Sequence, residues 1–203
     1  MDTAAILRYH TLVADKSPLP VVVYNYPGAV AGIDLDWEAS QRPAEHPNIV
    51  GTKFTCGNVG KLARVVANTR PVSDVVEESK ASPYLAYAGV ADFIAPSILV
   101  GGSRAIVGAA NVFPRLCVHV CNLAVQGRID RARVMQQKLA RADWSLIKRA
   151  IPGFKAILQH YHGYGGAACQ PMAALSQKAA KSLCEEMQWA MHLESQLPDV
   201  RDK

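Results

Sequence analysis

The chain has 203 residues, of which 50% are hydrophobic and 19% are charged, so it can bury a large core and is neither disordered nor fibrous. Its 22 Lys and Arg residues against 17 Asp and Glu residues give a net charge of +5, which fits anionic substrates. Only 7% of the residues are aromatic, and the basic residues from 128 to 149 alternate with apolar ones at helical intervals, which argues against a nucleic-acid-binding surface.

The first half of the chain alternates helical and strand-like segments. A helix is expected over 2–15, followed by an apolar, β-branched strand over 19–24. A helix over 34–44, with Asp34 or Asp36 as its cap, precedes a second strand over 48–53. Further along we expect a helix from Asn58 to Arg70-Pro71, a surface loop over 72–82, strands over 84–88 and 104–109, and a helix over 92–100.

After residue 110 the alternation stops, and the rest of the sequence has helical periodicity. The expected helices are 115–125, 128–141, 144–161 and 173–192, separated by Gly127, by Ala142-Asp143 and by a glycine-rich turn near Gly163. Four strands that alternate with helices indicate right-handed βαβ units and a parallel sheet. No Pro-rich or Ser-rich linker separates the two halves, so we expect one compact unit.

Two residues stand at the carboxyl ends of the first two strands, where parallel α/β proteins carry their chemistry. Tyr24 ends the first strand and Lys53 ends the second, so their side chains meet if the strands are neighbours. A desolvated lysine amine is partly neutral and can attack a ketone to form a Schiff base. From spacing alone, extension of Lys53 to solvent and packing of Tyr24 are the favoured interpretations.

The motifs around these two residues form an ordered series that is similar to a known family. They are Tyr24-Asn25-Tyr26-Pro27, His46-Pro47-Asn48-Ile49-Val50-Gly51-Thr52-Lys53, and Gly101-Gly102-Ser103-Arg104-Ala105-Ile106 continuing to Asn111. The series resembles the dihydrodipicolinate synthase and N-acetylneuraminate lyase family of pyruvate-dependent class I aldolases. The segments 9–15, 18–22, 151–153 and 163–166 make it most similar to the eukaryotic 4-hydroxy-2-oxoglutarate aldolase branch.

The resemblance implies an α/β fold of the (β/α)8 barrel type. A full barrel of this kind needs about 250 residues, so the chain is expected to supply only the last four βα units and a C-terminal helical extension. We therefore expect a single, N-terminally incomplete domain over 1–203, with βα units over 1–112 and a helical tail over 113–203. The missing half would contain the loop that holds the pyruvate carboxylate.

The same resemblance assigns roles to four residues. It implies that Lys53 is the Schiff-base nucleophile and Tyr24 the proton relay, with Gly89 and Ile106 beside the imine as substrate-binding residues. It implies no metal and no organic cofactor. One position departs from the family: the arginine that binds the aldehyde carboxylate in dihydrodipicolinate synthases is Ala29 here, which disfavours synthase activity.

The function implied is carbon–carbon lyase chemistry on a 4-hydroxy-2-oxo acid, either 4-hydroxy-2-oxoglutarate or a 2-keto-3-deoxy sugar acid. The products would be pyruvate or glyoxylate and an aldehyde or 2-oxo acid. A pyruvate-condensing synthase is the alternative within the family. A truncated, catalytically silent homologue that acts as an interaction module is the alternative from another class. The expected small-molecule partner is a 2-oxo acid, and no nucleic acid or membrane is expected as a partner. The resemblance also implies a homo-oligomer, a tetramer in the family, if the barrel is complete.

Other sequence features favour structural over functional interpretations. The five cysteines are an odd number without a secretory start, which favours a reducing compartment, and the expected location is the cytoplasm, or the mitochondrion if a missing N-terminal half carries a transit peptide. His119 faces away from Cys117 and Cys121 on a helix, so these are expected to be core thiols rather than zinc ligands. The segment 57–61 lacks the spacing of a phosphate loop.

Overall fold

A computed structural model describes residues 2–69 and 84–199. The expected loop over 72–82 lies outside the described residues. The chain divides into two compact units, each treated by itself below. The sheet unit comprises Met1–Gly89 and Pro96–Ile106, and the helical unit comprises Val90–Ala95 and Val107–Lys203. The single-domain expectation, with its division at residue 112, stays a prediction.

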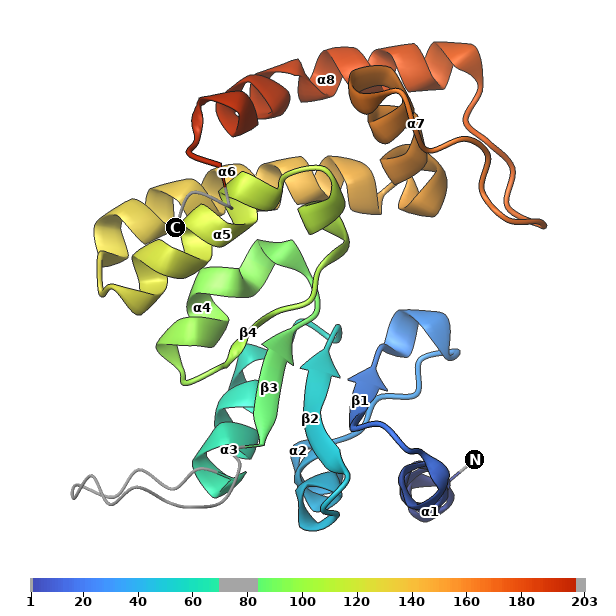
Figure 1. The fold of residues 1–203 in the computed structure, drawn as a ribbon, viewed down its shortest axis with the longest axis vertical. Helices are drawn as coiled ribbons and strands as arrows, with labels where there is room; N and C mark the ends of the chain where they lie inside the picture. The colour runs from blue at the N-terminus through green and yellow to red at the C-terminus, as the bar shows by residue number, and fades with distance from the viewer. Residues whose placement is uncertain (1, 70–83, 200–203) are drawn as a thin grey trace. The chain divides into compact units, whose positions relative to one another are not determined.

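The sheet unit is built on four parallel strands in the order β1-β2-β3-β4 (Figure 1). The strands are β1 (Val21–Asn25), β2 (Ile49–Phe54), β3 (Leu85–Ala88) and β4 (Arg104–Ala105). The connecting elements are α1 (Thr3–Lys16), η1 (Pro27–Ala29), α2 (Trp37–Gln41), η2 (Arg42–Glu45) and α3 (Val59–Thr69). Between β3 and β4 lie η3 (Ala91–Phe93) and α4 (Ile94–Leu99). The α/β class and the parallel sheet are confirmed.

The two faces of this sheet differ in exposure. Val23, Phe54 and Ala88 are buried on the face that we call the covered face. Val22 and Tyr24 alternate with them on β1 and are exposed on the other face, which we call the open face. Within the described residues β1 pairs only with β2, and β4 only with β3, so each of these strands has one unpaired edge.

Two expected elements in the sheet unit are shorter than the sequence pattern indicated. The helix expected over 34–44 begins at Trp37, capped by Asp36, whose carboxylate accepts from the Ala39 N–H at 2.7 Å. It becomes the 3-10 turn η2 at Arg42, because Pro43 has no N–H to donate to an α-helical partner. The strand expected over 104–109 ends at Ala105, although the Ile106 N–H still donates to the Ala88 carbonyl at 2.9 Å.

The helical unit contains four long helices and confirms the helical tail. They are α5 (Pro114–Val125), α6 (Ile129–Ile147), α7 (Ala150–His162) and α8 (Gln177–Gln196), preceded by the 3-10 turn η4 (Gly108–Asn111). Fully buried side chains from these elements make its core: Phe113, Leu116, Leu139, Leu146, Ile157, Leu183 and Met187. Among the described residues, no helix is both long and apolar enough to cross a membrane.

The break expected at Ala142-Asp143 was wrong, because α6 runs through both residues to Ile147. Both side chains are buried, and the Asp143 carboxylate accepts from the Ala91 N–H at 3.0 Å instead of competing for the helix backbone. The helix ends before Ala150, which has a positive φ of 48°. The last helix begins four residues later than expected, where Ser176 caps it.

Buried polar groups in the helical unit bind backbone groups at the starts of other elements. Glu194 accepts from the N–H groups of Arg115 and Leu116, each at 2.8 Å, and so caps α5. Gln136 accepts from the Ala95 N–H at 2.8 Å and donates to the Ala91 carbonyl at 2.9 Å. These contacts satisfy the N–H groups that a helix start leaves without internal partners.

Candidate active site

The two predicted chemical residues, Tyr24 and Lys53, meet on the open face of the sheet unit. They are register partners on neighbouring parallel strands, so their side chains leave the sheet on the same side. The Lys53 Nζ lies 4.1 Å from the centroid of the Tyr24 ring, within the range of a cation–π contact. The expectation that the two strands are neighbours is confirmed, whereas the catalytic roles of the two residues stay a prediction.

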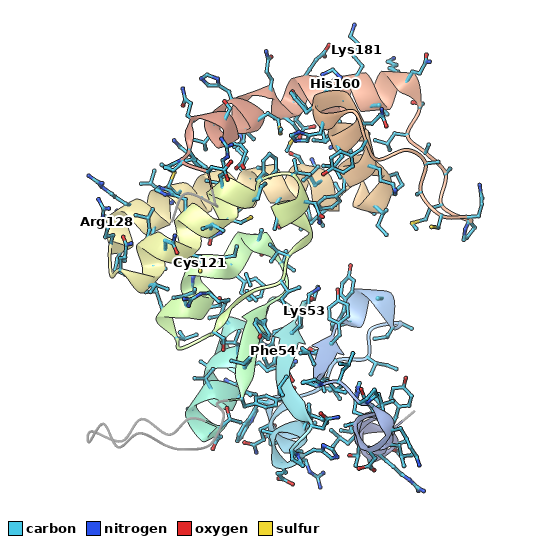
Figure 2. The ribbon with its side chains drawn as sticks, viewed as in Figure 1. Lys53, Phe54, Cys121, Arg128, His160 and Lys181 are labelled. Atoms are coloured by element: carbon cyan, nitrogen blue, oxygen red, sulfur yellow. The ribbon has the colours of Figure 1, made fainter. Side chains whose placement is uncertain are left out.

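Alternation along β2 explains why Lys53 lies on this face. Its neighbours Thr52 and Phe54 are fully buried on the covered face, and Figure 2 labels Lys53 beside Phe54 on the same strand. The Thr52 hydroxyl bonds to the Tyr84 hydroxyl at 2.6 Å, which fixes the register of the strand within the core. Burial of this phenol raises the pKa of Tyr84 to about 12, so it stays protonated. Lys53 itself is half-buried.

Tyr24 is 50% exposed and contacts a second aromatic ring from the same segment. The centroids of the Tyr24 and Tyr26 rings are 5.5 Å apart, at an interplanar angle of 32°. A Cβ atom at Gly28 would lie 3.0 Å from the Tyr26 ring, so the glycine lets the turn after β1 pass close to that ring. The sequence motif contained Tyr26, but nothing in its spacing distinguished a site residue from a turn residue.

The register also brings two residues to the site that sequence reasoning missed. Tyr87 on β3 is the register partner of Lys53, and Arg104 on β4 is the partner of Tyr87. The four side chains therefore form one row across the open face, with two cations at alternate positions. Arg104 is exposed, and its Nη1 donates to the Ser103 carbonyl at 2.9 Å. Such a row can attract a carboxylate to the amine of Lys53.

Gly89 directly follows β3, and Ile106, which the resemblance implied to lie on the fourth strand, directly follows β4. The Gly89 N–H donates to the Phe54 carbonyl at 3.0 Å. A Cβ at Gly89 would lie 2.0 Å from Thr55 Oγ1, so only glycine allows this approach. Within the described part of the chain, Thr55 Oγ1 is a buried hydroxyl without a hydrogen-bond partner. Ile106 is 44% exposed.

The arrangement has the groups required for imine chemistry. A primary amine at a strand end can attack a carbonyl carbon, and a phenol in contact with it can carry a proton to or from the substrate. Ala29, where the related synthases have an arginine, is exposed in η1. No guanidinium therefore occupies that position to bind a second carboxylate.

Comparisons with known proteins agree with this arrangement. Residues 1–190 match the dihydrodipicolinate synthetase family. The chain is 44% identical over 207 aligned positions to an L-threo-3-deoxy-hexylosonate aldolase from Aspergillus niger, covering 96% of this chain and 62% of the relative. It is 41% identical to a protein from Emericella nidulans named "probable 4-hydroxy-2-oxoglutarate aldolase, mitochondrial", covering 97% of this chain and 60% of the relative.

A solved structure of a dihydrodipicolinate synthase family protein from Coccidioides immitis has the same fold. It superposes with a TM-score of 0.80 at 27% identity, over 98% of this chain and 63% of that one. The chain thus spans about three fifths of the length of the proteins that it matches. A partial barrel, as expected from the four strands, is consistent with that coverage.

Proposed function

The chain belongs to the dihydrodipicolinate synthetase family, and from this premise we propose that its open face carries out Schiff-base cleavage of a 4-hydroxy-2-oxo acid. Lys53 is the nucleophile in this proposal, and Tyr24 is the proton relay. The contact between the Lys53 Nζ and the Tyr24 ring, at 4.1 Å, is the observation that carries it. The chain spans 62% of its Aspergillus niger relative, so the proposal concerns the chemistry of the whole protein.

The reaction begins when the neutral amine of Lys53 attacks the C2 ketone of the substrate. Loss of water gives a protonated imine, which acts as an electron sink. Tyr24 gives its phenolic proton to the departing hydroxyl of the carbinolamine and, as phenolate, takes the proton of the C4 hydroxyl, directly or through the substrate carboxylate, while the C3–C4 bond breaks to an aldehyde and an enamine. Protonation of the enamine at C3 and addition of water to the imine release pyruvate and regenerate the amine.

A 2-oxo-3-deoxy sugar acid is the substrate class that we propose. Two points support it: the name of the Aspergillus niger relative is that of an aldolase for such an acid, and Ala29 stands at the position where the resemblance implies a carboxylate-binding arginine in the synthases. Cleavage of a six-carbon acid of this class yields pyruvate and a three-carbon hydroxyaldehyde. Gly89 and Ile106 are proposed to line the imine, at the ends of β3 and β4.

The cellular compartment and the oligomeric state of the protein are also proposals. The Emericella nidulans relative carries the word mitochondrial in its name, which supports the mitochondrial alternative over the cytoplasm. Assembly into a homo-oligomer is proposed from family membership alone. Size-exclusion chromatography with light scattering tests assembly, and fractionation of the source cells tests the compartment.

The experiment that tests the proposed chemistry traps the imine. The purified chain is incubated with pyruvate and sodium borohydride, and the reduced adduct is located by peptide mass spectrometry. We expect one adduct, on the peptide that contains Lys53, and its loss in Lys53→Ala. The matched control is Lys16→Ala, which removes an exposed lysine of α1 in the same unit and should leave the adduct unchanged.

Absence of an adduct on Lys53, or equal labelling of exposed lysines, would contradict the lyase proposal for this chain. That outcome would favour the interaction-module alternative. Where the adduct forms, release of pyruvate from 2-keto-3-deoxy sugar acids and from 4-hydroxy-2-oxoglutarate separates the two substrates. Condensation of pyruvate with an aldehyde that carries a carboxylate tests the synthase alternative.

A further inference from the structure

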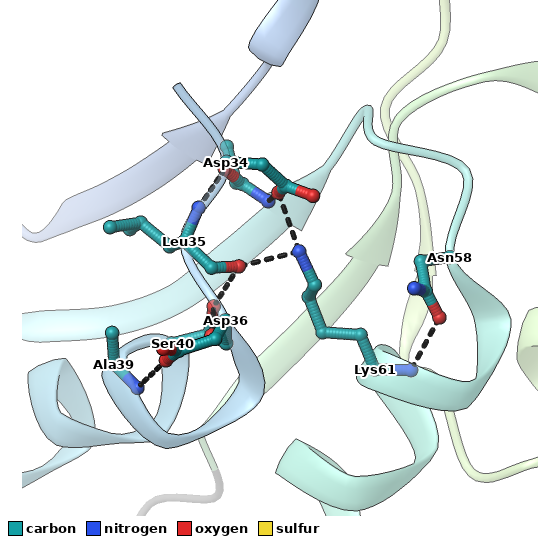
Figure 3. Close-up of polar contacts among 8 residues, drawn as sticks. Asp34, Leu35, Asp36, Ala39, Ser40, Asn58 and Lys61 are labelled. Atoms are coloured by element: carbon teal, nitrogen blue, oxygen red, sulfur yellow. Dashed lines mark hydrogen bonds and ion pairs between the residues drawn. The ribbon is translucent and has the colours of Figure 1, made fainter. Parts of the chain in front are cut away.

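A second lysine, Lys61 of α3, is buried and belongs to a polar cluster that ends beside Tyr24. The carboxylate side chain of this cluster, Asp34, is 41% exposed. We infer that Lys61, acting through Asp34 and Asn25, is a positioning residue that sets the place of the Tyr24 ring relative to the Lys53 amine. This inference deepens the proposed function and rests on it. We call Asn25, Asp34, Leu35 and Lys61 the strand-end cluster. Figure 3 labels Asp34, Leu35 and Lys61, with dashed lines from the Lys61 amine to the other two.

The ammonium group of Lys61 binds two acceptors within the cluster. Its side chain is only 5% exposed, and Nζ donates to the Asp34 carboxylate and to the Leu35 carbonyl. A buried ammonium without such partners would cost several kcal/mol. Because this group is buried and donates to two acceptors, we assign Lys61 a structural role and not that of a second nucleophile.

Asn25 joins the cluster to the end of β1. Its side chain is buried, with Nδ2 donating to Asp34 Oδ1 at 2.8 Å and Oδ1 accepting from the Leu35 N–H at 3.2 Å. Its backbone carbonyl accepts from the Thr55 N–H at 2.9 Å. Asn25 directly follows Tyr24, and Thr55 lies two residues after Lys53, so this one residue ties together the ends of both strands.

The start of α3 fixes Lys61 in turn. The Asn58 side chain accepts from the Lys61 N–H at 2.8 Å, which caps the helix that follows β2. The cluster therefore links two loops: the one after β1, which bears Asp34 and Leu35, and the one after β2, which leads to Lys61. Movement of either loop shifts Tyr24 and Lys53 relative to one another.

Electrostatics favour the ionised form of this cluster. Burial acts to raise the pKa of Asp34, but the hydrogen bonds from Lys61 and Asn25 outweigh it and hold the pKa below its usual value. The carboxylate is thus charged at neutral pH and stays paired with the ammonium of Lys61. Tyr24, by contrast, is half exposed and its ring contacts neighbouring site groups, so the cluster acts on it through its backbone.

A double-mutant cycle tests the inference. Lys61→Met removes the cation with little change in shape, and Tyr24→Phe removes the phenol. We expect Lys61→Met to lower kcat for aldol cleavage roughly tenfold to a hundredfold with KM nearly unchanged, as for a small displacement of a catalytic group. In the Tyr24→Phe background, Lys61→Met should lower kcat almost no further, because the loss of the Lys61 cation acts on kcat through the phenol of Tyr24.

The exposed Lys16→Met provides the matched control and should leave kcat unchanged. Equal loss of kcat from Lys61→Met with and without the phenol would overturn the inference, since a merely structural role would be additive. If Lys61→Met fails to fold by circular dichroism, Asp34→Asn replaces it in the cycle, because the amide keeps one acceptor for Asn25 and removes the charge that pairs with Lys61.

A second readout does not need activity. Fluorotyrosine is placed at position 24, and its ¹⁹F resonance is recorded in the full chain with and without the Lys61→Met substitution. We expect a shifted or broadened resonance for Lys61→Met and an unchanged one for Lys16→Met. An unchanged resonance for Lys61→Met overturns the positioning role, whereas failure of the borohydride trap in the unmutated chain overturns the lyase proposal.

Discussion

The helical unit and the sheet unit use their polar side chains in opposite ways. In the helical unit, Asp143 and Glu194 are buried and accept hydrogen bonds from backbone N–H groups of other elements. In the sheet unit, Tyr24 and Lys53 lie on an open face, and each contacts the other. Burial against the backbone of another element marks the first pair as structural, whereas a position on an open face marks the second pair as candidate chemical residues.

The strand β2 contains both situations in adjacent residues. Phe54 is completely buried on the covered face, while Lys53 is half-buried on the open face. The covered and open faces of the sheet therefore differ in the same way as the two units, and single substitutions on each face can test that difference.

The first prediction contrasts Phe54→Ala with Lys53→Ala. Removal of a fully buried aromatic ring is expected to lower the free energy of unfolding by about 3–5 kcal/mol. Lys53→Ala should change it by less than about 1 kcal/mol while it abolishes the borohydride adduct. Urea denaturation followed by circular dichroism measures both. Similar losses for the two variants would break the distinction between the faces.

The second prediction concerns the capping carboxylate of the helical unit. Glu194→Ala leaves the N–H groups of Arg115 and Leu116 without their acceptors, so we expect a loss of about 2–4 kcal/mol. Glu194→Gln keeps one acceptor oxygen and should lose less. Chemical denaturation of the parent, Glu194→Gln and Glu194→Ala ranks their free energies of unfolding. An equal loss of stability in the two variants would argue against hydrogen bonding as the cause.

The third prediction is a pH dependence in the same unit. Burial raises the pKa of Asp143 to about 6 from a usual value of 3.8. The group therefore contributes stability that is fully present below about pH 4 and is lost as pH rises through 6, up to about 3 kcal/mol. Asp143→Asn should remove this loss, so the stability of the variant should rise relative to that of the parent between about pH 4 and 7. The midpoints of thermal unfolding, measured for both proteins across that range, check this, and an equal pH dependence of the two midpoints would contradict the prediction.

The smallest expected effect on stability is that of Tyr24→Phe. The ring is 50% exposed and its hydroxyl is not needed for packing, so the free energy of unfolding should change by less than about 0.5 kcal/mol. Cleavage should nevertheless slow by about 10²-fold, as expected for loss of a general acid–base group, while the Lys53 adduct still forms. A destabilised Tyr24→Phe would instead give the tyrosine a packing role.

Sequence reasoning reached the pairing of Tyr24 with Lys53 because apolar, β-branched runs identify parallel strands and place their ends at one edge. It left Asp34 and Asp36 as equal cap candidates, since both precede the same helix. Only the fold shows that Asp36 caps α2, while Asp34 binds Lys61, a residue 27 positions away. The acceptors of a buried lysine depend on how loops pack, which no local pattern encodes.

The break expected in α6 failed for a related reason. An Asp after an Ala is a weak helix position when its side chain competes for the local backbone, but Asp143 finds its partner at Ala91, 52 residues earlier in sequence. Likewise, Tyr87 and Arg104 gave no signal of their own. Their place beside Lys53 follows from strand register, which the sequence determines only through the whole sheet.

The edge of β1 that no other described strand covers has a consequence for handling the protein. This unpaired edge belongs to a strand with a run of three valines, Val21 to Val23, and an unpaired edge of this kind can add to a strand of another molecule. We therefore expect self-association that grows with protein concentration and with ionic strength, as salt screens the net positive charge. Kinetic work on this chain is best done dilute, at low salt, with turbidity recorded alongside activity.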